Sequence, residues 1–126
     1  MSLQAIGIVS ANLKKSVKFY KILGVHLKPV MVPTHLEGKT PGGIDIMVDD
    51  LKSILKIYPK WKKPKGSSGV VLCFKQKSPA AVDKIHSKLV KSGFKSLNAP
   101  WDAFWGQRYA NVADPDGNQI DLYASL

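Results

Sequence analysis

The chain passes twice through the same order of structural signals, and this repeat constrains its fold more than any other feature. Each half opens with an apolar strand, continues into an amphipathic helix and ends the helix with a glycine. The two strands are expected at 4–10 and 70–75, the helices at 12–24 and 79–92, and the closing glycines are Gly24 and Gly93. Glycine suits a helix end because it adopts positive φ without a steric penalty. The sequence therefore predicts two copies of one module in series.

Further strands complete each module. Runs of apolar or alternating residues bounded by proline, glycine and aspartate are typical of strands. They are expected at 25–32 and 43–48 in the first half, and at 94–98, 107–113 and 119–123 in the second, with turn signals at 33–41 and a loop at 99–105. We expect one α+β domain over residues 1–126, built from tandem β-α-β-β-β modules at about 1–60 and 70–126, with an exposed linker at 61–69.

Helical spacing predicts which residues reach the core. The expected apolar stripes are Leu13, Val17, Tyr20 and Leu23 in the first helix, and Val82, Ile85 and Leu89 in the second. Asn12 suits the start of the first helix as a capping residue. The run 114–118, Asp-Pro-Asp-Gly-Asn, predicts a tight turn, because proline fixes φ at its second position and glycine accepts positive φ.

The composition is that of one soluble globular domain. At 126 residues and 44% hydrophobic, the chain has enough apolar material for a core. No apolar run is long enough for a membrane span and no signal peptide is visible, so we expect a cytoplasmic protein without a membrane partner. The one cysteine, Cys73, lies in an apolar run and is expected to be buried in a strand.

Positive charge is unevenly distributed along the chain. The net charge is +10, and every lysine lies at or before Lys95, whereas the stretch from Ser96 onward carries one arginine and four aspartates. A basic surface attracts anions. Since the lysines are dispersed and follow no nucleic-acid motif, binding of nucleic acid or of an acidic protein ranks last among the functions that we consider.

Three segments resemble the vicinal-oxygen-chelate superfamily, the glyoxalase and bleomycin-resistance type. They are 12–24, 71–93 and 105–122, and the last holds both Trp-Gly-Gln-Arg-Tyr and Asp-Pro-Asp-Gly-Asn-Gln-Ile-Asp-Leu. The resemblance implies that the curved mixed sheets of two modules enclose a ligand cavity, with helices on the outer faces. It also implies a homodimer, in which modules pair within one chain or are exchanged between two.

Enzymes of this family hold a divalent metal with His, Glu or Gln side chains from inner strands of both modules. Carried over by position, the two histidines fall on Ala5 and Val71, which have no metal-binding atom, and the two glutamates fall near Asp45 and on Asp121. The nitrogen donors that favour zinc, nickel or iron are therefore missing. We expect no cofactor, and the alternative is a divalent metal held by Asp45 and Asp121.

The resemblance and the strand period together suggest the residues around the cavity. Alternation turns Gln119, Asp121 and Tyr123 to one face of the last strand, away from the apolar pair that packs under a helix. The expected ligand-binding residues are His35, Trp101, Phe104, Trp105, Arg108, Gln119, Asp121 and Tyr123. The aromatic residues could instead cover the end of the core, and Arg108 could instead pair with an aspartate of the 114–118 turn.

Two functions of different kinds fit this pattern best. The first is a small-molecule-binding protein that sequesters a planar or anionic organic compound without metal chemistry, resembling the antibiotic-resistance branch of the family. Bleomycin itself suits a basic chain poorly, because bleomycin is cationic. The second is a divergent metal-dependent lyase, isomerase or dioxygenase of the same fold. No catalytic residue is assigned.

Overall fold

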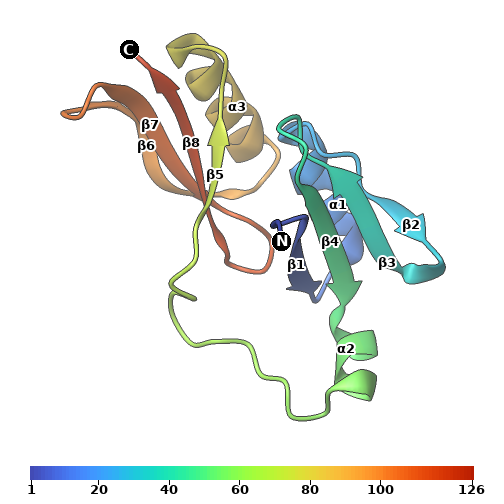
Figure 1. Ribbon diagram of the computed structural model, residues 1–126. Coiled ribbons are helices and arrows are strands. Elements are labelled where there is room, and N and C mark those ends of the chain that lie inside the picture. Colours follow the sequence, from blue (N-terminus) through green and yellow to red (C-terminus); the bar gives the residue numbers. More distant parts are fainter. The chain divides into compact units, whose positions relative to one another are not determined.

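A computed structural model describes the whole chain, residues 1–126, and divides it into two compact units. Unit 1 is Met1–Lys63 and unit 2 is Pro64–Leu126, so the boundary falls inside the stretch expected to be a linker. Each unit contains one four-stranded mixed sheet (Figure 1). The α+β class and the tandem order of strands and helices predicted from the sequence are confirmed.

Unit 1 has the strand order β1-β4-β3-β2. Its strands are β1 Ala5–Ser10, β2 Lys28–Val30, β3 Val32–Lys39 and β4 Asp45–Asp50, and its helices are α1 Leu13–Ile22 and α2 Leu51–Ile57. Strands β1 and β4 run parallel, whereas β4 with β3 and β3 with β2 run antiparallel. The first strand of the module, β1, therefore forms one edge of the sheet. The last strand, β4, lies beside it in the interior of the sheet.

Unit 2 repeats this arrangement with the strand order β5-β8-β7-β6. Its elements are β5 Leu72–Lys75, α3 Pro79–Lys91, β6 Lys95–Ala103, β7 Gln107–Ala113 and β8 Gln119–Ser125. Again the first strand pairs in parallel with the last, and the remaining pairs are antiparallel. The two modules therefore share one topology, although few residues are identical between them.

The helix faces that reach the core differ in one respect from the prediction. In α3, Val82 and Leu89 are fully buried, as the spacing predicts. In α1, the buried residues are Ser16, Phe19 and Tyr20, so the buried face is rotated away from the predicted stripe at its N-terminal end. The reason is a buried hydrogen bond of 2.7 Å between the hydroxyl groups of Ser16 and Ser10, which brings a small polar residue against the sheet.

Two segments where the sequence predicts turns or loops form strands instead: the expected turn segment 33–41 holds most of a separate strand, β3, and β6 extends into the expected loop at 99–105. Strand β3 passes through Pro33, which costs no bond to β4 because that pairing begins at His35. Strand β6 continues past Pro100 to Ala103 by means of two register shifts. The predicted loop at 99–105 is thereby reduced to a short turn that ends at Gly106, whose φ of 92° suits glycine.

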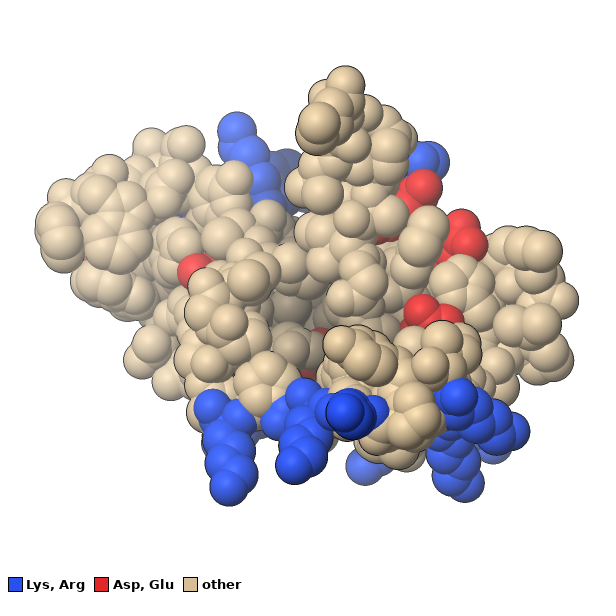
Figure 2. All heavy atoms as spheres, turned by 60° about the horizontal axis from the view of Figure 1, so that its bottom comes forward, with Lys and Arg blue, Asp and Glu red and all other residues tan.

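The surface reflects the lysine-rich composition. In Figure 2, lysine and arginine side chains project from the face in several groups, whereas acidic side chains are few. None of the three helices combines the length and the apolar character needed to cross a membrane.

Candidate functional site

In unit 2, one face of the sheet packs under α3 and the other face is open. Val112, Ile120 and Leu122 are fully buried on the helix side. Because side chains alternate along a strand, the residues between them point to the opposite side. Strand pairing places these neighbours on the open face: Cys73 and Lys75 on β5, Gln119, Asp121 and Tyr123 on β8, Tyr109 and Asn111 on β7, and Asn98 and Trp101 on β6.

Four rings form an aromatic cluster on this open face, namely Trp101, Trp105, Tyr109 and Tyr123. The centroid separations are 5.5 Å for Trp101 and Trp105, 5.3 Å for Trp105 and Tyr109, and 6.0 Å for Tyr109 and Tyr123. The first two pairs meet edge to face and the third is stacked. Register holds three of these residues in place, because Tyr109 pairs across the sheet with both Trp101 and Tyr123.

A shallow pocket of about 350 Å³ lies against this cluster. It is lined by Asn98, Ala99, Trp101, Trp105, Tyr109 and Asn111, all from β6, β7 and the turn between them. This volume is at the small end of ligand sites, which run from roughly 300 to 1,000 Å³. Aromatic walls with a few polar groups at one end are the usual composition of a site for a small organic molecule.

A buried carboxylate anchors the polar end of the site. Asp121 is 7% exposed and accepts three hydrogen bonds. The hydroxyl of Tyr109 donates to Oδ2 at 2.7 Å, while Nδ2 of Asn111 and Nε2 of Gln119 donate to Oδ1 at 2.6 and 2.9 Å. These donors compensate the charge that burial would otherwise make costly. Burial and the Asp121 carboxylate together raise the pKa of Tyr109, so its hydroxyl stays a neutral donor.

Most of the residues expected in the site are brought together on this face. Trp101, Trp105, Gln119, Asp121 and Tyr123 all lie there. Phe104 differs, because it occupies the turn, is 92% exposed, and contacts only the edge of the cluster through Trp105, at a centroid separation of 5.0 Å.

Arg108, which was expected either to line the site or to pair with an aspartate, does not lie on this face of the sheet. Its position on β7, next to Tyr109, turns it to the face covered by α3. There its Nε donates to Oδ1 of Asp83 at 2.9 Å and its Nη1 donates to Oδ1 of Asp102 at 3.0 Å. The alternative expected from the sequence is an ion pair between Arg108 and an aspartate of the turn at 114–118. The observed partners of Arg108 lie on α3 and β6 instead.

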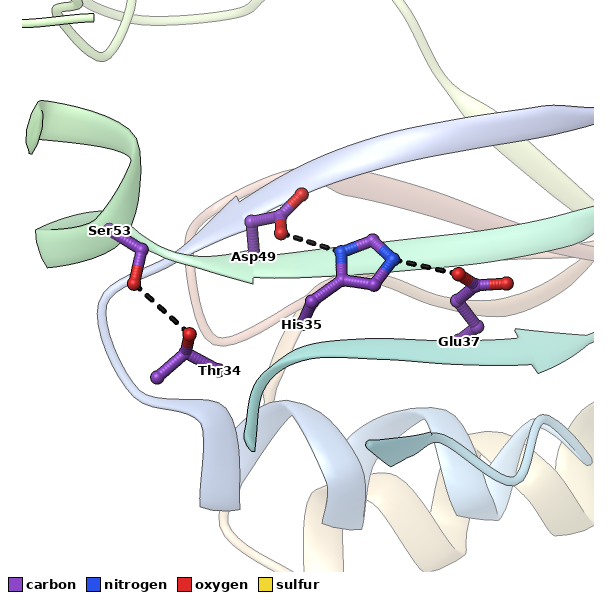
Figure 3. A network of polar contacts seen from close by, with 5 residues as sticks. All are labelled: Thr34, His35, Glu37, Asp49 and Ser53. Carbon is purple, nitrogen blue, oxygen red and sulfur yellow. Dashed lines mark hydrogen bonds and ion pairs between the residues drawn. The ribbon is translucent and has the colours of Figure 1, made fainter. Parts of the chain in front are cut away.

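His35 belongs to a different network, in unit 1, on the face of the sheet opposite the buried side chains of Leu36 and Val48. Its Nδ1 lies 2.6 Å from Oδ1 of Asp49, and its Nε2 lies 2.8 Å from Oε2 of Glu37 (Figure 3). Hydrogen bonds that the ring donates to Asp49, the larger cause, and to Glu37 raise the pKa of His35 above its ordinary value. Nearby, Ser53 of α2 donates to Thr34 at 3.1 Å, which ties the start of β3 to that helix.

The family's metal-ligand positions can now be compared between the two units. Counting from the N-caps of α1 and α3, which are Asn12 and Ser78, Gly7 in unit 1 corresponds to Cys73 in unit 2. Gly7 pairs with Met47, and Cys73 pairs with Asp121. Met47 therefore occupies the place in unit 1 that Asp121 occupies in unit 2, whereas Asp45 stands opposite Ala5.

The donors at these positions do not fit the metal that the family implies. Ala5 and Val71 offer no donor atom, and Met47 offers only a thioether sulfur. Asp45 is held in an ion pair by Lys39, at 2.9 Å. Both oxygens of Asp121 already accept hydrogen bonds from the sheet.

Several residues of the site were not predicted from the sequence. Tyr109, Asn111 and Asn98 line the pocket, and the alternation along β7 is the signal that points to the first two. Cys73 was expected to be buried, but its side chain is exposed on the open face opposite Asp121. Partial desolvation and the Asp121 charge raise the pKa of the Cys73 thiol, which disfavours the reactive thiolate.

Comparison with known proteins agrees with this fold. The chain is similar to the solved structure of a glyoxalase/bleomycin resistance protein/dioxygenase family enzyme from Burkholderia phytofirmans, with 19% identity, a TM-score of 0.86 and 100% of both chains covered. It is also similar to hypothetical protein SA1046 from S. aureus, with 18% identity, a TM-score of 0.82, and 98% of this chain and 92% of that chain covered. No curated protein matched the sequence.

A third structure, a glyoxalase-related enzyme from Fulvimarina pelagi, has 17% identity and a TM-score of 0.82, with 98% of this chain and 88% of that chain covered. At these identities the structures share the fold only. The sequence profile named Glyoxalase/Bleomycin resistance protein/Dioxygenase superfamily matches residues 2–122. The chain, built from two modules of one topology, therefore belongs to that superfamily.

Proposed function

We propose that this protein binds a planar aromatic small molecule against the aromatic cluster of unit 2. The observation that carries the proposal is the pair of tryptophans beside the pocket, Trp101 and Trp105, which are 42% and 49% exposed and yet held in fixed edge-to-face contact. Aromatic rings kept at a surface with one face free are suited to stack on a flat ligand. Exposure of this much apolar area to water costs free energy, and a ligand that covers the rings would remove that cost.

The site is better suited to capture than to chemistry. The family's metal positions lack the nitrogen donors, and Asp121 is engaged by three neutral donors. The remaining reactive groups, the Tyr109 hydroxyl and the Cys73 thiol, both have raised pKa values, so neither supplies a nucleophile or a base near neutral pH. These features support sequestration of the ligand without metal chemistry.

Binding of a simple flat ring tests the proposal. Quinoline is titrated into ¹⁵N-labelled protein, and the indole N–H signals of Trp101 and Trp105 are followed by NMR. Trp101→Ala and Trp105→Ala should each weaken binding by about tenfold, because each removes roughly 1–1.5 kcal/mol of ring contact. Trp61→Ala is the matched control, since Trp61 belongs to unit 1 and does not line the pocket.

Two outcomes would count against the proposal. One is that quinoline moves neither indole signal at any concentration. The other is that the Trp61→Ala variant loses as much affinity as the two pocket variants.

The proposal extends to a homodimer in the cytoplasm. One support for the dimer is that members of the family often pair modules from two chains. A second support is that strands β2 and β6 each have an outer edge that is unpaired within its own sheet. Sedimentation equilibrium of the purified protein tests the dimer, and a mass near 13.8 kDa at every concentration would exclude it.

A further inference from the structure

We infer that one end of unit 1 binds a negatively charged lipid surface. The contact surface, called here the basic end, consists of helix α2 with the segment that follows it, residues 51–63, and of the tip of the β2-β3 hairpin, residues 30–32. It lies in the other unit from the aromatic pocket. The sequence-based expectation of no membrane partner concerned spanning segments and signal peptides, and binding to a lipid surface needs neither.

Helix α2 leaves apolar side chains in water. It projects from the end of β4 (Figure 1), and none of its residues is buried. Ile57 is 81% exposed, Leu55 is 39% exposed, and Tyr58, which directly follows the helix, is 61% exposed. Single apolar residues are ordinary on a surface, whereas a contiguous group marks an interaction site.

The hairpin tip adds a second apolar group at the same end of the sheet. Strand β3 runs antiparallel to β4, so β3 begins where β4 ends and α2 starts. The hydrogen bond from Ser53 of α2 to Thr34 of β3 joins the two elements (Figure 3). At the tip, three consecutive apolar side chains are exposed, namely Val30, Met31 and Val32.

Met31 has a backbone conformation that methionine rarely adopts. Its φ is 67°, in the left-handed region that glycine and asparagine adopt most readily. Glycine at this position would remove both the strain and an apolar side chain from water. The long, flexible thioether side chain that is present instead adapts well to an irregular apolar environment.

The segment 51–63 is strongly basic. It holds five lysines and no acidic residue. All five are exposed and none forms an ion pair; they are Lys52, Lys56, Lys60, Lys62 and Lys63.

Few carboxylates oppose this charge. Of the acidic residues in unit 1, Glu37 and Asp49 pair with His35, and Asp45 pairs with Lys39. Asp50, which precedes α2, is the remaining one. Five lysines without an ion pair therefore stand against one such carboxylate, which favours an anionic partner.

Aliphatic side chains among lysines favour a lipid surface over other anionic partners. Anionic headgroups attract the lysines, and Ile57 and Met31 can enter the boundary between headgroups and acyl chains. Nucleic acid offers bases that stack on aromatic rings but no comparable place for aliphatic side chains. A second copy of this chain, meeting the first across a two-fold axis, would bring the same lysines face to face.

Vesicles of two compositions test the inference. Wild-type protein is sedimented with vesicles of phosphatidylcholine mixed with phosphatidylglycerol, and with vesicles of phosphatidylcholine alone. We expect binding to the anionic vesicles only. Raising the salt from about 0.1 M to about 1 M should weaken it by more than tenfold, because the Debye length shrinks from about 10 Å to about 3 Å.

Two double variants separate local charge from net charge. Lys62→Gln/Lys63→Gln should weaken binding to the anionic vesicles by about thirtyfold, since each lysine near the surface contributes about fivefold. The matched control is Lys18→Gln/Lys21→Gln, which removes the same charge from exposed positions of α1. That helix ends beside Pro41, in the turn between β3 and β4, at the opposite end of the sheet. The control should change binding by less than about threefold.

Two single variants remove apolar contacts and keep the charge. Ile57→Ser and Met31→Asn should each weaken vesicle binding by about three- to tenfold, because each withdraws one side chain from the bilayer. Asparagine tolerates the positive φ at residue 31, which preserves the hairpin. Val90→Ser is the matched control, since Val90 is an exposed apolar residue of α3, and it should leave binding unchanged. Circular dichroism and melting temperature establish that all variants are folded.

Several results would overturn the inference. One is that the anionic vesicles are not bound, or are bound no better than phosphatidylcholine alone. Another is that the two lysine pairs cause equal losses, which would assign binding to net charge. A labelled oligothymidylate that binds more tightly than the vesicles, with no effect of Ile57→Ser, would assign the basic end to nucleic acid. Loss of a dimer in Ile57→Ser, measured by sedimentation equilibrium, would assign it to a second copy of the chain.

Discussion

Nδ1 of His35 lies 2.6 Å from Oδ1 of Asp49, its cross-strand neighbour on β4. The other ring nitrogen faces Glu37 at 2.8 Å, so the imidazole is held between two carboxylates (Figure 3). A neutral imidazole donates from one nitrogen only, whereas the protonated ring donates from both. The geometry therefore favours the charged form of His35, which agrees with the raised direction of its pKa.

This arrangement predicts a specific pH dependence of stability. The folded-state pKa of His35 is raised above the unfolded value of 6.5, so its contribution is fully present below that value and is lost as the pH rises through the folded pKa. The melting temperature of wild type should exceed that of His35→Gln by more at about pH 6 than at about pH 9. A difference that stays constant with pH would contradict the imidazolium assignment.

His86 serves as a control, because its contribution to stability should depend on pH in the opposite direction. Burial lowers its pKa, and its Nε2 lies 2.7 Å from the hydroxyl of Ser96. Protonation of this ring opposes folding, so its contribution to stability should grow as the pH rises through 6.5. The comparison of His86→Gln with wild type should therefore show the reverse trend.

The two carboxylates around His35 should not be equivalent. Asp49 is the larger cause of the raised pKa and Glu37 the smaller. Both Asp49→Asn and Glu37→Gln should lower the pKa of His35 measured by NMR titration of the ring protons, and Asp49→Asn should lower it more. If Glu37→Gln lowered the pKa of His35 more than Asp49→Asn did, this predicted order would be wrong. The stronger charged hydrogen bond would then be the one from Nε2 to Glu37.

The sequence predicted those features that depend on residue period alone. Alternation along β8 placed Gln119, Asp121 and Tyr123 on one face. Asn12 predicted where α1 begins, and Gly24 and Gly93 predicted where α1 and α3 end. These signals are local, since a strand with one buried face fixes the direction of every side chain in it.

Features that depend on register between strands could not be predicted in this way. The contact of Arg108 with Asp83 joins β7 to α3, and that of His35 with Asp49 joins β3 to β4. In both contacts the two residues are far apart in the sequence. Strand β3 was not predicted, because Pro33 is a turn signal in the sequence. The hydrogen bonds that join Asp121 to Asn111 and Asn111 to Asn98 likewise depend on the pairing of three strands.

Two glycines in unit 1 offer a matched test of packing. A Cβ added at Gly38 would lie 2.8 Å from the backbone oxygen of His26 and 2.9 Å from Cγ1 of Val25, whereas one added at Gly7 would meet nothing within 4 Å. Gly38→Ala should lower the free energy of unfolding by about 1–3 kcal/mol. Gly7→Ala should change it by no more than about 0.5–1 kcal/mol, with stabilisation as the favoured sign. Urea denaturation of both variants measures the difference.

The position of Arg108 predicts a separation between stability and binding. Arg108→Lys loses the planar fork that reaches Asp83 and Asp102 together, so the melting temperature should fall slightly, and the loss should shrink in high salt. Quinoline affinity should stay unchanged, because the side chain lies on the α3 face. A marked loss of affinity for quinoline would contradict this prediction and would show that Arg108 contributes to ligand binding.

The Asp121 carboxylate provides the test of metal dependence. Its oxygens are engaged by Tyr109, Asn111 and Gln119, so we expect it to stabilise the sheet without a metal. Asp121→Ala should lower the free energy of unfolding by about 1–3 kcal/mol, because buried donors lose their acceptor. The loss should be the same after treatment with a chelator and after incubation with nickel, zinc, manganese or iron(II). If wild type instead retains about one metal per chain through desalting, and Asp121→Ala does not, metal chemistry would replace simple capture as the function of this site.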